Sequence, residues 1–151
     1  MTARRWTLQL DGVLLPGPNR LIRMHAQEYR KLRDELLLLA RASLTPAAPA
    51  TPLAACHLRI TLQRPARSLL DVDAKYGAIK PLLDVLQAGR SYTRKIGGHS
   101  LQDTTVGLSL IHDDRDGEGE LTGCIRSLQV VQVVGEPRVE VVIEEDLRPA
   151  I

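Results

Sequence analysis

Hydrophobic and polar residues alternate in four parts of the chain, and this alternation predicts β-strands. The runs are residues 6–15, 56–63, 126–134 and 138–145, in which apolar side chains recur at every second position. A shorter apolar run at residues 106–111 predicts a further strand. The last two long runs are separated by Gly135-Glu136-Pro137, which predicts that they form a hairpin.

Two other segments carry the three- and four-residue spacing of helices. The longer covers residues 25–43, and the second follows an acidic turn near residue 73. Pro81 lies inside the second segment, so this helix either kinks there or starts late with Pro81 in its first turn. Residues 45–54 and 89–105 have no clear period, which predicts loops. The apolar positions expected to face the core are Tyr29, Leu32, Leu36 and Leu39 in the first helix and Ile79, Leu82, Leu83 and Leu86 in the second.

The order strand, helix, strand, helix, strands predicts a mixed α/β fold: one sheet flanked by two main helices. With 151 residues the chain is long enough for one well-buried core. We therefore expect a single domain over residues 1–151, without internal repeats.

The apolar runs and the cysteines of the chain indicate in which compartment the protein works. The longest strongly apolar run, residues 36–40, is far shorter than the ~20 residues of a spanning helix, and no export signal is visible at the start. Cys56 and Cys124 lie 68 positions apart without a CxxC spacing. These features predict a cytoplasmic protein, without membrane contact, in which both cysteines are buried free thiols.

Charge is distributed unevenly along the chain. Residues 1–100 hold 16 Lys and Arg and 7 Asp and Glu, a net charge of +9. Residues 101–151 hold 4 Lys and Arg and 11 Asp and Glu, a net charge of −7. Such a split is typical of proteins that bind both a polyanion and a metal ion, and it also occurs in proteins that only dimerise. The basic residues that we expect to contact phosphates are Arg20, Arg23, Arg90, Arg94 and Lys95.

Two acidic pairs are candidates for metal binding. In extended backbone the side chains of Asp71 and Asp73 point to the same side, and two carboxylates suit magnesium. The alternative is that Asp73 only caps the following helix. The second pair is Asp113-Asp114, of which at most one side chain can join the first pair.

A lysine near the first acidic pair is a candidate for contact with the scissile phosphate. Lys80 follows Asp73 by seven residues, which puts both on one face of a continuous helix. The alternative is a surface ion pair between Lys80 and Asp84. Lys75 lies nearer the acids in sequence and is a second candidate.

Four sequence segments, in this order, resemble those of the RusA-type Holliday junction resolvases. They are LLPGPNRLIRMH with the following EYRKLRDEL, then RSLLDVDAKYGAIKPLLDVLQ, then IHDD, and finally PRVEVVIEE. Together they span most of the chain. By position, the resemblance implies that Asp71, Asp73 and Asp114 bind the metal and that Lys80 is the active-site lysine.

The resemblance implies a magnesium-dependent endodeoxyribonuclease, with manganese as a substitute ion, that acts as a homodimer. It would resolve four-way DNA junctions by paired nicks in recombination and repair. Two alternatives stay open. One is a DNA-binding dimer with a decayed site, for which Ala74 in place of the family's usual asparagine is the best argument. The other is a metal nuclease that acts on other branched DNA or on RNA.

Overall fold

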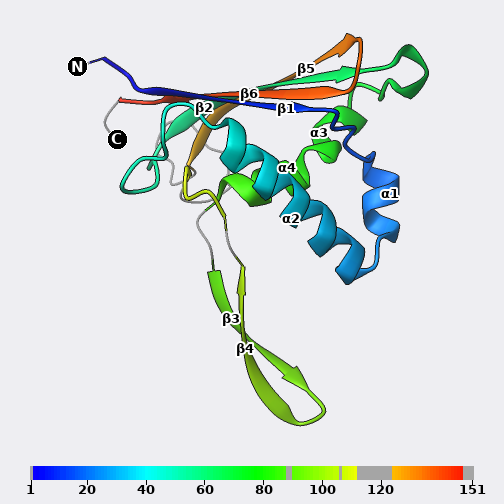
Figure 1. Ribbon diagram of the computed structural model, residues 1–151, viewed down its shortest axis with the longest axis vertical. Helices are drawn as coiled ribbons and strands as arrows, with labels where there is room; N and C mark the ends of the chain where they lie inside the picture. Colours follow the sequence, from blue (N-terminus) through cyan, green and yellow to red (C-terminus); the bar gives the residue numbers. More distant parts are fainter. Residues whose placement is uncertain (1, 88–89, 106, 112–123, 148–151) are drawn as a thin grey trace.

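Four strands form the central sheet of the computed structural model, which describes residues 2–87, 90–105, 107–111 and 124–147. The spatial order is β1-β6-β2-β5. β6 pairs antiparallel with β1 and with β2, whereas β2 and β5 are parallel. The strands are β1 (Arg5–Asp11), β2 (Cys56–Arg64), β5 (Ile125–Val134) and β6 (Arg138–Glu145). Figure 1 shows the helices on one side of this sheet.

The alternation of the sequence separates the two faces of the sheet. Buried residues at alternate positions, such as Leu8 in β1, Ile60 in β2 and Val141 in β6, form the core with the helices. The intervening positions, such as Thr7 and Arg59, form the opposite face. The predictions for residues 56–63 and 138–145 are confirmed, and the first strand ends at Asp11, where Gly12 adopts a positive φ of 76°.

The first long helix is confirmed almost to the residue. Leu36, Leu37 and Ala40 are its buried residues, whereas Leu39 is 40% exposed, so the expectation that Leu39 faces the core was wrong. A short helix that the sequence patterns did not predict precedes it, although a proline in the first turn is a helix-start signal. The helical segments are α1 (Pro18–Arg23), α2 (Ala26–Ser43), the 3₁₀ turn η1 (Ala66–Ser68), α3 (Ala74–Ala78) and α4 (Lys80–Leu86).

Pro81 begins a new helix and does not kink a continuous one. Ile79 is both the C-cap of α3 and the N-cap of α4, and Pro81 lies in the first turn of α4. A proline there costs no intrahelical hydrogen bond. The expectation that Asp73 and Lys80 share a face of one continuous helix was therefore wrong.

The predicted hairpin of the last two strands does not form. β2 lies between β5 and β6 in the sheet, and the Gly135–Pro137 connection crosses the end of β2. The Gly135 N–H donates to the Arg64 carbonyl at 2.9 Å, and Gln63 Nε2 donates to the Glu136 carbonyl at 2.9 Å. A tripeptide reaches across two strand spacings of ~4.8 Å, so its length alone does not identify a hairpin.

A hairpin forms instead where a loop was predicted. β3 (Arg90–Ile96) and β4 (His99–Thr105) pair antiparallel from Arg90↔Thr105 to Ile96↔His99. Gly97 and Gly98 form the turn with φ of 57° and 81°, values that glycine adopts without strain. Figure 1 shows this hairpin projecting away from the sheet beyond the helices. The Gly-Gly pair is the sequence signal for this turn.

Residues 107–111 are not the predicted strand, and Val106 lies outside the described residues. Their backbone N–H groups bond to the C-terminal end of α4: Leu108 to the Val85 carbonyl at 2.8 Å and Leu110 to the Leu86 carbonyl at 3.0 Å. Gly107 approaches Gln87 so closely that an added Cβ would lie 1.9 Å from the Gln87 carbonyl oxygen. Glycine is therefore required at this position.

The cysteines are buried free thiols, as expected. A hydrogen bond with Cys124 and burial both raise the pKa of the Cys56 thiol, which disfavours the reactive thiolate. Cys124 Sγ donates to the Leu53 carbonyl at 3.1 Å. In the part of the chain that the structure describes, no helix is long and apolar enough to cross a membrane.

Replacing Gly107 by alanine is expected to lower the free energy of unfolding by about 2 kcal/mol or more, because the new methyl group overlaps the Gln87 carbonyl. Denaturant unfolding measures the change. Gly17→Ala is the matched control, since its added Cβ would meet only Leu70 Cδ2, at 3.4 Å. Equal stability of Gly107→Ala and the parent protein would contradict this close approach.

Candidate metal centre and nucleic-acid interface

The acidic turn, defined here as residues Asp71–Asp73, follows a backbone segment that β5 holds in place. The Gln132 side chain accepts a hydrogen bond from the Leu70 N–H at 2.8 Å and donates one to the Leu70 carbonyl at 3.0 Å. One amide thus satisfies both backbone groups of the residue before Asp71. The acidic turn is therefore attached to the sheet by a side chain from a neighbouring strand.

The backbone of the acidic turn is not extended, contrary to the sequence prediction. Asp73 has helical angles, φ −76° and ψ −36°, and its Oδ1 accepts from the Ala74 N–H at 3.0 Å. The Asp71 carbonyl accepts from the Lys75 N–H at 3.1 Å. Asp73 is therefore the N-cap of α3, which was the alternative interpretation of its sequence position. Both acidic side chains are exposed.

The acidic turn carries two of the three carboxylates that are expected to bind magnesium. Two exposed carboxylates offer the hard oxygen ligands that this ion takes, with water and substrate phosphate as its remaining ligands. Within residues 2–87, 90–105, 107–111 and 124–147, no group of three or more His, Cys, Asp or Glu side chains is placed to hold a metal ion. Asp114, the third expected ligand, lies outside the described residues together with Asp113.

The segment that leads to Asp113-Asp114 is anchored at the other end of β5. Ile111 forms bridges with Leu53 and Gln87, and the Leu53 carbonyl accepts from Cys124 Sγ, just before β5 begins. Leu70 is attached to Gln132, eight residues further along. At ~3.3 Å per residue these two anchor points are about 26 Å apart along the strand.

Lys80 forms the ion pair that was the alternative to a catalytic role. Its Nζ lies 3.1 Å from Asp84 Oδ1, and the Tyr29 hydroxyl from α2 donates to Asp84 Oδ2. The Lys75 side chain lies over the Tyr76 ring, with 5.7 Å between Nζ and the ring centroid. Lys75 belongs to the first turn of α3 beside the Asp73 cap, whereas Lys80 belongs to the next helix.

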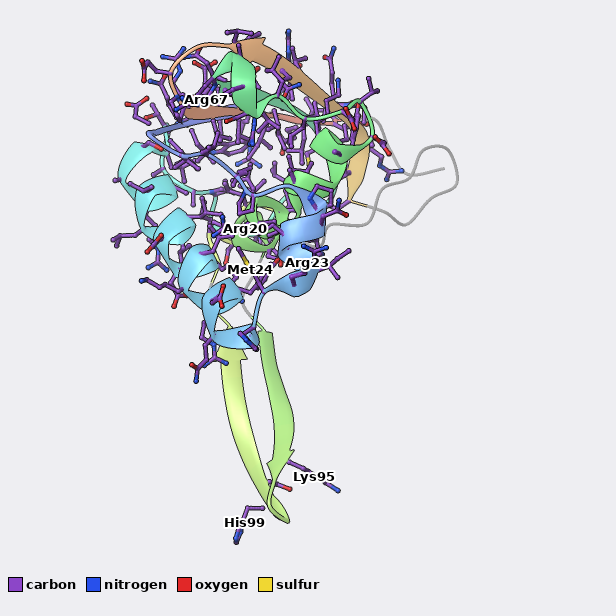
Figure 2. The ribbon with its side chains drawn as sticks, turned by 90° about the vertical axis from the view of Figure 1, so that its right-hand side faces the viewer. Arg20, Arg23, Met24, Arg67, Lys95 and His99 are labelled. Atoms are coloured by element: carbon purple, nitrogen blue, oxygen red, sulfur yellow. The ribbon has the colours of Figure 1, made fainter. Side chains whose placement is uncertain are left out.

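The basic helix α1 packs beside the acidic turn. An added Cβ at Gly77 of α3 would lie 2.9 Å from Pro18 Cβ, so the two short helices touch at this glycine. Arg20 and Arg23 are exposed on α1, where Figure 2 labels them. Two of the five predicted phosphate contacts therefore lie on an element adjacent to Asp71 and Asp73.

The other predicted phosphate contacts lie on the hairpin. Lys95 is exposed near its tip, and Figure 2 shows Lys95 and His99 far from α1. Arg90 and Arg94 belong to β3, and their side chains lie outside the described part of the structure. The predicted contacts thus form two separate basic regions, one on α1 and one on the hairpin.

One polar cluster was not anticipated from the sequence. His57 Nδ1 lies 2.6 Å from Ser127 Oγ, and His57 Nε2 lies 3.3 Å from Asp146 Oδ2. A serine, a histidine and an aspartate in a chain are the composition of acyl-transfer triads. Asp146 follows β6 directly, so the cluster fastens this segment to the sheet.

A second feature that was not anticipated is Arg64, a cation at an inward-facing position of β2. Its side chain is 6% exposed, and burial lowers its pKa. Nε donates to the Ser68 carbonyl at 2.7 Å and Nη1 to the Leu15 carbonyl at 2.6 Å. Arg64 therefore joins the start of the β2–α3 connection to the segment after β1.

Comparisons of the chain with protein-family models, with curated proteins and with solved structures find no match.

Replacing Gln132 by methionine, which is similar in shape, removes both hydrogen bonds to Leu70. The free energy of unfolding should fall by about 1–3 kcal/mol, and hydrogen exchange at the Leu70 amide should become faster. Mass spectrometry of exchanged protein locates the change. Gln129→Met on the exposed face of β5 is the control and should change neither quantity. Unchanged exchange at Leu70 would show that Gln132 does not hold the acidic turn.

Proposed function

We propose that the chain is a magnesium-dependent endonuclease that nicks branched DNA, with four-way junctions as its main substrate, in the manner of RusA-type resolvases. The proposal starts from the sequence resemblance. The observation that carries it further is the acidic turn, whose two exposed carboxylates follow a backbone fixed by Gln132 and lie beside the basic helix α1.

This arrangement supports a division of tasks between residues. A bound magnesium ion would polarise the scissile phosphate and activate water, which is the chemistry that two-carboxylate sites support. Asp71 and Asp73 would hold that ion. Asp114 follows Ile111, which is anchored at the other end of β5, so its place in the same ligand set stays a prediction from the resemblance. Of the two candidate lysines we favour Lys75 for contact with the phosphate, because Lys80 is paired with Asp84.

The basic residues would hold the substrate. Arg20 and Arg23 on α1 would bind phosphates next to the acidic turn, and Lys95 on the hairpin would bind a more distant part of the DNA. Contacts of this kind depend on salt and carry no sequence information.

A homodimer would present two such sites to one junction. Large apolar side chains are exposed near the acidic turn: Val72 is 78% and Tyr76 43% exposed, and Ile22 on the adjacent α1 is 82% exposed. The partner surface that we favour includes Ile22 and leaves the carboxylates of the acidic turn open to DNA.

A second candidate function is DNA binding without cleavage. Two observations favour it: Asp73 Oδ1 is already used by the helix cap, and Lys80 is paired with Asp84. Ala74 replaces the asparagine that is usual in the family. The experiment below separates the two candidates, because a binding protein forms the same complex with or without magnesium and releases no cut strand.

Asp73→Asn should abolish magnesium-dependent cleavage of a labelled four-way junction while junction binding stays unchanged or becomes tighter. Asparagine keeps the oxygen that caps α3 but removes one negative charge near a polyanion. Asp11→Asn on β1 is the control for removing an exposed carboxylate elsewhere. Equal loss of binding and cleavage would contradict a role of the Asp73 charge in cleavage alone. Parent protein that binds but never cuts would favour the second candidate function.

Replacing Arg90, Arg94 and Lys95 together by alanine should weaken junction binding and reduce the slope of log affinity against log salt by roughly 0.9 for each phosphate that the variant no longer neutralises. The melting temperature should change little, because the hairpin projects away from the sheet and the helices (Figure 1). Titrations at several salt concentrations measure the slope. The control replaces Arg5 and Arg59 on the open face of the sheet. An unchanged slope in the triple variant would exclude the hairpin from the DNA interface.

A further inference from the structure

A cavity of about 540 Å³ opens between α1, α2 and the end of β2. Its volume falls in the roughly 300–1,000 Å³ range of small-molecule sites. Leu14, Met24 and Leu32 supply apolar side chains to its wall, and Arg20, Lys31 and Arg64 supply positive charge. Figure 2 shows Arg20 and Met24 in the space between α1 and α2.

Arg64 is the unusual member of this wall. It occupies an inward position of β2 where the alternation otherwise places leucine or isoleucine, and only 6% of its surface is exposed. Two backbone carbonyls accept hydrogen bonds from its Nε and Nη1. Among the described residues no carboxylate forms an ion pair with it. A buried cation without a counter-charge is costly, and an anion in the cavity would lower that cost.

The rest of the wall suits a ligand with a flat apolar body. The Met24 and Leu32 side chains can cover the face of an aromatic ring, since methionine adapts its shape and makes favourable contacts with such rings. Glu28 and Glu35 also line the cavity, and their carboxylates can accept hydrogen bonds from the amino groups of a nucleobase. Three cations and two carboxylates leave a net positive wall.

The cavity also adjoins the acidic turn. Gly17 belongs to the cavity wall, and an added Cβ there would lie 3.4 Å from Leu70 Cδ2, next to Asp71. The neighbouring Pro18 contacts Gly77 of α3. One short segment therefore forms part of the cavity on one side and supports the acidic turn on the other.

We propose that this cavity binds one nucleotide, with its phosphate on Arg64 and Arg20 and its base against Met24 and Leu32. The source that we favour is an unpaired nucleotide of a bound DNA strand, and this part rests on the proposed function. Taking a base out of the stack is least costly where pairing is already disrupted, as at a branch point.

The methionines offer a direct measure of occupancy of the cavity, because the chain has only Met1 and Met24. Protein labelled with ¹³C in the methionine methyl groups is titrated by NMR with inorganic phosphate, with deoxyadenosine monophosphate and with a single-stranded tetradeoxyadenylate. A Met24→Leu variant assigns the signals. We expect the nucleotide and the oligonucleotide to move the Met24 methyl signal upfield in a saturable way, through the ring current of the base.

A variant at the rim of the cavity tests the positive charge of its wall and leaves the structural hydrogen bonds of Arg64 in place. Arg20→Ala should weaken the affinity measured from the Met24 shift about tenfold, as expected for removing one charge-assisted hydrogen bond to the phosphate. Arg67→Ala is the matched control, because Arg67 is also exposed and lies away from the cavity (Figure 2). An equal effect of Arg67→Ala would overturn the assignment of the phosphate to the cavity.

The remaining outcomes are equally definite. No shift of Met24 with either nucleotide probe overturns the inference, and so does a shift with phosphate that deoxyadenosine monophosphate does not exceed. A shift with the monophosphate but not with the tetradeoxyadenylate supports the cavity and identifies a free nucleotide as its source. Cleavage of junctions without a Met24 response defeats this inference alone, whereas a Met24 response without cleavage defeats the proposed function alone.

Discussion

The parallel pairing of β2 with β5 is the constraint on which the rest of the structure depends. Two parallel strands cannot be joined by a tight turn, so the chain between Arg64 and Ile125 has to return across one face of the sheet. The acidic turn, α3, α4 and the hairpin all belong to this crossover. Because α4 buries Leu82, Val85 and Leu86 against the core, the crossover covers the apolar face of the sheet while it carries the candidate chemistry.

Polar contacts to backbone groups hold the crossover where it leaves β2 and again beyond α4. At its start, Arg64 bonds to the Ser68 carbonyl and Gln132 bonds to both backbone groups of Leu70. Beyond α4, residues 107–111 bond through their N–H groups to the carbonyls at the end of that helix. Each contact satisfies backbone groups that no strand or helix partner satisfies, which ties the position of Asp71 to the sheet while its side chain stays exposed.

Sequence patterns predicted the elements that are defined by one buried face. They failed where the structure depends on which strand pairs with which. Alternation identified β2 and β6, and periodicity identified α2, since one buried face suffices to produce these patterns. Alternation could not show that β2 lies between β5 and β6, because strand pairing depends on residues distant in sequence. At the site, the cap formed by Asp73 and the ion pair of Lys80 were foreseen as alternatives. The role of Arg64 was not foreseen, because a single inward-facing cation at the end of an apolar strand pattern leaves no periodic signal in the sequence.

The length of the hairpin sets how far the proposed DNA interface extends from the helices. Strands of seven residues extend about 20 Å, which corresponds to roughly six base-pair steps of duplex DNA. Two strands without a third are marginally stable by themselves, so the hairpin depends on its base, where residues 107–111 are fixed to α4. A substrate that contacts both Lys95 and the acidic turn has to span the hairpin and α4 together. Under the proposed function, an extended duplex arm is long enough to meet that requirement and a single nucleotide is not, so the spacing of the two basic regions bears on the length of the substrate.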